Sequence, residues 1–104
     1  MIPDGVVVGA LLHFKREKRP YRVTAVGYRF AIAWKPYPGS YMYTIVDFQT
    51  RVRGPDNMIF GPHYEYNTTK GASEGIAALE SEDSELEVSH RRLCKLDLVK
   101  VSKS

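Results

Sequence analysis

The chain has 104 residues, of which 43 % are apolar, a net charge of +3 and a single cysteine, Cys94. A chain of this length holds one hydrophobic core, so we expect a single domain over residues 1–104. The apolar runs are far shorter than the roughly 20 residues that cross a bilayer, and one cysteine excludes an intramolecular disulfide. No basic-then-apolar leader is recognisable, and we therefore expect a cytoplasmic protein.

The charges are distributed unevenly along the chain. Residues 1–71 carry ten Lys and Arg against five Asp and Glu, residues 72–88 carry six acids and no base, and residues 89–104 carry five bases and one acid. A basic body with one acidic patch can contact a polyanion through the first and repel it through the second. The alternative is that the basic surface and the acidic patch are both simply solvated and bind no partner.

Alternating apolar residues predict the first strands. A strand from Val6 to Phe14 follows the turn at residues 3–5, and a charged loop from Lys15 to Pro20 leads into a second strand at Tyr21–Val26. Strands at Tyr28–Lys35 and Tyr41–Phe48 flank the Pro38-Gly39 turn and form a hairpin. Successive antiparallel strands that are apolar on both faces favour a small SH3-like barrel or half-barrel.

The second half of the chain is less regular. A loop at 51–57 precedes irregular chain at 61–71, and the only predicted helix runs from Ser73 to Asp83, with Ser73 as N-cap. Alternating apolar residues up to Val101 predict a final strand that closes the sheet. We expect a mainly antiparallel β protein with one short helix, ending in a loose tail at 102–104.

Candidate catalytic and metal-binding groups are few. His13, His63, His90 and Cys94 lack the paired spacings of a structural zinc site, and no nucleophile elbow or glycine-rich phosphate loop is present. The acids between Glu80 and Glu87 are typical of a solvated helix end. We therefore expect no enzyme activity, no metal and no cofactor.

Basic residues and interspersed aromatic residues indicate nucleic-acid binding as the leading function. Cations meet phosphates, while Tyr28, Trp34, Tyr37 or Tyr41 offers a ring on which a base can stack. Structural tyrosines with scattered surface arginines are the alternative. The predicted nucleic-acid-binding residues are Lys15, Arg16, Lys18, Arg19, Arg22, Arg51 and Arg53.

Protein binding is the alternative function from a different class. Exposed tyrosines are common interface anchors, and here the candidates are Tyr37, Tyr41, Tyr64 and Tyr66, together with the acidic helix. A host-protein-binding modulator and a structural homo-oligomer that pairs through an edge strand both fit this pattern.

The segment Tyr43-Thr44-Ile45-Val46-Asp47 is followed by Arg51-Val52-Arg53-Gly54-Pro55-Asp56-Asn57-Met58-Ile59-Phe60-Gly61. Over about residues 20–61, this sequence resembles those of small accessory proteins encoded by phages of actinobacteria. Such proteins are mostly uncharacterised. The resemblance implies a small protein made during infection in the host cell cytoplasm, acting on host proteins or nucleic acid, and it transfers no functional residues.

Overall fold

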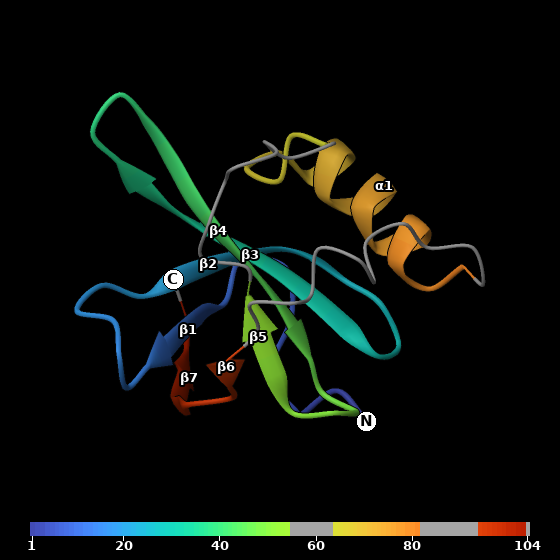
Figure 1. Ribbon diagram of the computed structural model, residues 1–104, viewed down its shortest axis with the longest axis horizontal. Helices are drawn as coiled ribbons and strands as arrows, with labels where there is room; N and C mark the ends of the chain where they lie inside the picture. The colour runs from blue at the N-terminus through green and yellow to red at the C-terminus, as the bar shows by residue number, and fades with distance from the viewer. Residues whose placement is uncertain (55–63, 82–93, 104) are drawn as a thin grey trace.

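The computed structural model describes residues 1–54, 64–81 and 94–103. The described residues form seven strands and one helix (Figure 1). Their bounds are β1 Leu11–Phe14, β2 Tyr21–Val26, β3 Phe30–Tyr37, β4 Ser40–Asp47, β5 Val52–Gly54, α1 Thr69–Leu79, β6 Cys94–Lys95 and β7 Leu98–Ser102.

The strands make one antiparallel sheet with the order β6-β5-β4-β3-β2-β1-β7. The two outermost strands, β6 and β7, are consecutive in the chain and are separated only by Leu96 and Asp97. A sheet whose two edges are joined by two residues must curl on itself, so it forms a half-barrel with one helix. The predicted mainly antiparallel β fold is therefore confirmed.

The β3–β4 hairpin has the predicted turn. Its register runs without a break from Phe30↔Asp47 to Tyr37↔Ser40, which leaves Pro38 and Gly39 as a two-residue turn. Gly39 adopts φ +77°, a conformation that glycine reaches without steric cost. The ring of Pro38 fixes its own φ at the preceding turn position. The tip of the hairpin extends beyond the other strands (Figure 1).

Apolar side chains cover both faces of the sheet. The inner face encloses a barrel core, and helix α1 covers part of the outer face (Figure 1). The barrel core contains Val6, Ala10, Leu12, Phe14, Tyr21, Val23, Ala31, Ala33, Val46 and Phe48. The core beneath α1 contains Ala25, Phe30, Ile32, Tyr43, Ile45, Tyr66, Ala72, Ile76 and Leu79.

Helix α1 begins four residues before the predicted start. Thr68 is the N-cap, and its hydroxyl accepts a hydrogen bond from the N–H of Gly71 at 3.0 Å. Ser73, the predicted N-cap, is exposed inside the helix. The prediction was wrong because it assigned Gly71 to the irregular chain at 61–71, whereas Gly71 is buried on the packed face of α1. Asp83, the predicted end, lies outside the described residues.

The predicted first strand is also only partly correct. Regular pairing begins at Leu11, because Gly9 has φ +92° and turns the chain, although residues 6–10 continue the apolar pattern. At the other end of the chain, Ser102 is part of β7 and pairs with Leu11, so the loose tail cannot begin at this residue. In the described part of the chain, no helix is long and apolar enough to span a membrane.

Candidate nucleic-acid interface

The segment Lys15 to Pro20, here called the basic loop, connects β1 to β2. Its four cationic residues, Lys15, Arg16, Lys18 and Arg19, are all exposed. The loop is anchored through its backbone, since the N–H of Lys15 donates to the Asp97 carbonyl at 2.9 Å and the N–H of Arg16 donates to Asp97 Oδ2 at 2.9 Å. These bonds hold the base of the loop while its charged side chains face solvent.

The carboxylate in the basic loop, that of Glu17, is directed toward the barrel. It accepts a hydrogen bond from Lys35 Nζ at 2.6 Å and lies 3.7 Å from Arg53 Nη2. The side chain is 17 % exposed. Because two cations already neutralise Glu17, it does little to offset the four exposed charges of the loop.

Arg53 lies inside the barrel with 1 % exposure. Its Nε–H donates to Asp97 Oδ1 at 2.6 Å, and its guanidinium lies 4.2 Å from the centre of the Phe14 ring. Burial raises the pKa of Asp97, but hydrogen bonds from Arg53 and from the Arg16 N–H outweigh burial and lower this pKa. Arg53 was predicted to contact nucleic acid beside Arg51; its burial excludes that contact in this structure.

Arg51 is exposed and adopts φ +59° in the turn before β5. Its carbonyl accepts a hydrogen bond from the N–H of Leu96 at 2.8 Å, and the next residue, Asp97, holds Lys15. The corner between β6 and β7 thus connects the turn of Arg51 to the base of the basic loop. Of the two predicted loop arginines, Arg51 alone reaches solvent.

A transverse row of paired residues crosses the outer face of the sheet. Arg22 lies directly opposite Leu11 on one side and opposite Trp34 on the other. Directly paired residues of antiparallel strands project to the same face, so the exposed Arg22 and the half-buried Trp34 are neighbours there. Lys100, opposite His13 on β7, adds an exposed cation that was not among the predicted residues. In the sequence, Lys100 lies between Val99 and Val101, and this alternation of apolar and charged residues in a strand indicates that Lys100 is on the opposite face from the two valines.

Aromatic rings continue this row toward α1. Trp34 and Tyr41 meet edge to face, with ring centres 6.2 Å apart and planes at 87°. Tyr64 and Tyr43 lie 6.2 Å and 4.4 Å from the ring of Tyr66. The predicted protein-binding tyrosines thus separate: Tyr41 and Tyr64 are half-buried and Tyr66 is buried in the core. Tyr37, at the hairpin tip, is 57 % exposed.

Two further carboxylates stabilise the fold at the β2–β3 turn. Asp47 forms a bidentate pair with Arg29, at 2.9 Å and 2.6 Å, and accepts bonds from the Gln49 and Thr50 N–H groups and from the Thr50 hydroxyl. Burial raises the pKa of Asp47, yet these hydrogen bonds lower it to about 2. Glu80, after α1, accepts from the N–H of Tyr28 at 3.0 Å and fixes the helix end to this turn.

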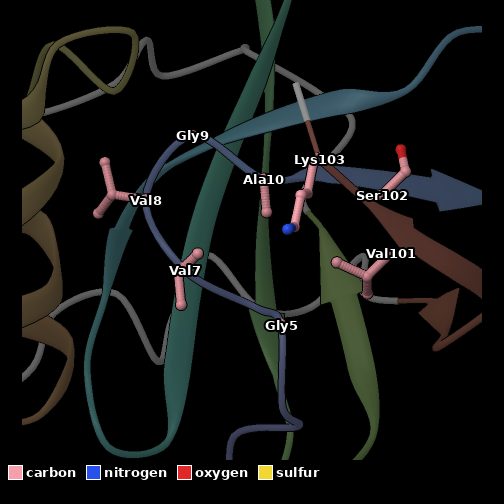
Figure 2. A pocket seen from close by; sticks show the side chains of 8 residues that line it. All are labelled: Gly5, Val7, Val8, Gly9, Ala10, Val101, Ser102 and Lys103. Atoms are coloured by element: carbon pink, nitrogen blue, oxygen red, sulfur yellow. The ribbon is translucent and has the colours of Figure 1, made fainter.

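A shallow hollow of about 430 Å³ lies between residues 5–10 and the end of β7. Figure 2 shows Val7 and Val8 on the arch that precedes β1, with Val101 and Lys103 across from them. Lys103 is the charged residue of this lining, so the hollow lacks the converging polar groups of a catalytic pocket.

Catalytic and metal-ligating groups do not converge among the described residues. In this part of the chain, no three His, Cys, Asp or Glu side chains form a cluster that could hold a metal ion. His13 pairs with the Ser102 hydroxyl at 2.7 Å, and Cys94 is half-buried in β6. His63 and His90 lie outside the described residues. Comparison with protein-family models, curated proteins and solved structures gave no match for the chain.

Proposed function

We propose that the protein binds nucleic acid through the basic loop, without catalytic activity. One observation carries the proposal: the loop presents four exposed cations while its own carboxylate, Glu17, is paired internally with Lys35 and Arg53. Clustered Lys and Arg side chains of this kind neutralise phosphates and release counterions, which provides affinity without reading sequence.

The surroundings of the loop support the same function. Exposed cations adjoin it on two sides, with Arg22 and Lys100 on the outer face of the sheet and Arg51 in the turn joined to Asp97 by way of Leu96. Asp97 lies beside the loop but is bonded to Arg53 and to the Arg16 N–H. Among the described residues, a phosphate backbone along this end of the barrel therefore meets exposed cations, and the two neighbouring carboxylates, Glu17 and Asp97, are already bonded.

The test is fluorescence anisotropy with labelled single- and double-stranded DNA and RNA, repeated from low to high salt. Binding should weaken steeply as salt rises, because each neutralised phosphate contributes about 0.7 to 0.9 to the logarithmic slope. Lys18→Gln and Arg19→Gln should each reduce the slope by about that amount. Lys103→Gln removes the same charge in the hollow beyond β7 and should leave the slope unchanged.

Two results would overturn the proposal. The first is that none of the tested nucleic acids binds the protein at low salt. The second is an equal loss of slope in Lys18→Gln and Lys103→Gln, since this would mean that overall charge, and not the basic loop, drives association.

The hairpin tip favours a second candidate, a protein partner. Tyr37 is 57 % exposed between two prolines at the end of the β3–β4 hairpin. Tyrosine there supplies a large, rigid contact at low conformational cost. If this candidate is correct, Tyr37→Ala abolishes capture of a host protein by the immobilised chain, whereas Tyr28→Ala, at the still more exposed tyrosine of the β2–β3 turn, does not.

We also propose a fold family and a cellular setting for this activity. The half-barrel is compatible with an SH3-like barrel, in which the last strand returns to pair with the first, as β7 does with β1. The resemblance to actinobacterial phage proteins suggests a role in the host cytoplasm during infection. Both stay predictions, because the chain matched no family model and no solved structure.

A further inference from the structure

We infer that the outer face beside the basic loop is a stacking site for unpaired bases, so that the preferred partner is single-stranded nucleic acid. The inference rests on the proposed function, because the basic loop supplies the phosphate contacts that bring a strand to this face. The stacking site consists of Arg22, Trp34 and Tyr41, which lie on the three adjacent strands β2, β3 and β4.

The pairing of the strands fixes the position of these three side chains. Arg22 lies directly across from Trp34, and Trp34 pairs with Tyr43, two residues along β4 from Tyr41, so Trp34 and Tyr41 are diagonal neighbours on one face. Directly opposed and diagonal residues of an antiparallel pair are within reach of long and aromatic side chains. A cation and two rings therefore stand side by side on one rigid sheet, next to the start of β2 where the basic loop ends.

The indole of Trp34 offers carbon surface and not a hydrogen-bonding group. The indole N–H of Trp34 is fully buried, although the residue itself is half-buried, so the solvent-facing part of this side chain excludes its polar atom. Trp34 and Tyr41 meet at 87°, and a flat base that stacks on one ring would meet the other ring edge-on. Such a corner accepts any base, because every base has a π-face, and it reads no sequence.

A duplex does not suit this arrangement. Its bases are stacked on each other and reach a protein only through groove edges, which are read by hydrogen-bonding side chains. The described rings are set on the sheet, where an unpaired base can lie against them while its phosphates contact Arg22 and the basic loop. The positive charge thus favours binding of any nucleic acid, and the two rings of the stacking site add a preference for single strands.

Tryptophan fluorescence tests the inference directly, because Trp34 is the only tryptophan of the chain. Three probes of equal length, about 12 nucleotides, are titrated: oligothymidylate, the same deoxyribose-phosphate chain without bases, and a blunt duplex. Oligothymidylate should quench Trp34 and bind more tightly than the abasic chain by about fivefold or more per stacked base. The abasic chain should bind through phosphates without quenching.

Substitutions separate the contribution of the stacking site to binding from that of the basic loop. Tyr41→Leu should reduce the preference for oligothymidylate over the abasic chain and leave abasic binding unchanged, whereas Val8→Ala, at an exposed apolar residue of the hollow beside β7, should alter neither. Trp34→Leu should reduce the same preference, and thermal unfolding will verify that it is folded. Lys18→Gln should weaken all three probes similarly and leave the preference intact.

The outcomes distinguish the two proposals. If no probe binds, the proposed function itself fails. If all three probes bind equally and Trp34 is not quenched, nucleic-acid binding stands and the stacking site is overturned. Quenching by an acidic peptide such as polyglutamate, with none by oligothymidylate, would assign the corner to a protein partner and would also overturn the inference.

Discussion

Arg53 and Asp97 meet inside the barrel, where Nε–H of the arginine donates to Oδ1 of the aspartate at 2.6 Å across a sequence separation of 44 residues. Asp97 also holds the backbone of Lys15 and Arg16. One buried pair therefore connects β5, the corner between β6 and β7, and the base of the basic loop. Its integrity bears on both stability and the presentation of the loop.

We predict that Arg53→Met destabilises the protein by about 3 kcal/mol or more, because it leaves Asp97 without its cation in a largely buried position. Urea denaturation measures the change. Arg51→Ala, a matched change at the exposed arginine two residues earlier, should cost less than about 0.5 kcal/mol. Equal stability of the two variants would contradict the structural role of the buried pair.

Asp47 should contribute to acid sensitivity. Its pKa of about 2 in the folded protein lies below the ordinary value of 3.8, so the unfolded chain takes up the proton first as pH falls. The stabilisation is complete above about pH 4 and is lost as pH falls toward 2, with a total of up to about 2 kcal/mol. Asp47→Asn should be less stable at pH 7 and should lose less stability between pH 4 and 2. A parallel decline of the two proteins would contradict this.

Gly75→Ala should destabilise the protein although alanine favours a helix. An added Cβ would lie 2.6 Å from Tyr66 Cε1 and 3.1 Å from Ile32 Cδ1, so the helix must move away from the sheet. Overpacking of this kind costs about 1 to 3 kcal/mol, more than the gain in helix propensity of about 1 kcal/mol. Thermal unfolding measures the sign; a stabilised variant would show that α1 packs more loosely.

The start of α1 is testable by two cap substitutions. Thr68→Ala removes the bond that the side chain accepts from the Gly71 N–H and should cost about 1 kcal/mol. Ser73→Ala changes an exposed position inside the helix and should be neutral or slightly stabilising. The reverse order of the two effects in chemical denaturation would move the N-terminus of the helix back to Ser73.

Local patterns were sufficient to predict the centre of the fold. The second strand was predicted with the observed bounds, Tyr21–Val26, and the third and fourth deviate by at most two residues at each end. These strands are formed by two-residue alternation and by a Pro-Gly turn, both of which act between neighbours in sequence. Pairing then follows with little chain entropy to overcome.

The errors arose where distant contacts decide the outcome. Gly75 weakens an isolated helix, but here it permits close approach to Tyr66, a contact that no local pattern indicates. Arg51 and Arg53 alternate around Val52, yet one is exposed and the other is buried because Asp97 lies in the interior. The exposure of the basic loop agrees with its pattern of charges, and its role in binding stays a prediction, whereas Arg53, assigned to the same site, is buried.

The pairing of β7 with β1 also has a consequence for synthesis on the ribosome. The contact between His13 and Ser102 spans 89 residues, so β1 stays without its outer neighbour until the strand that completes the barrel has left the exit tunnel. The hairpins of β2, β3 and β4 can form earlier, since their partners are adjacent. A nascent chain halted before Leu98 should thus carry an open strand edge at β1, which β7 covers once it has emerged.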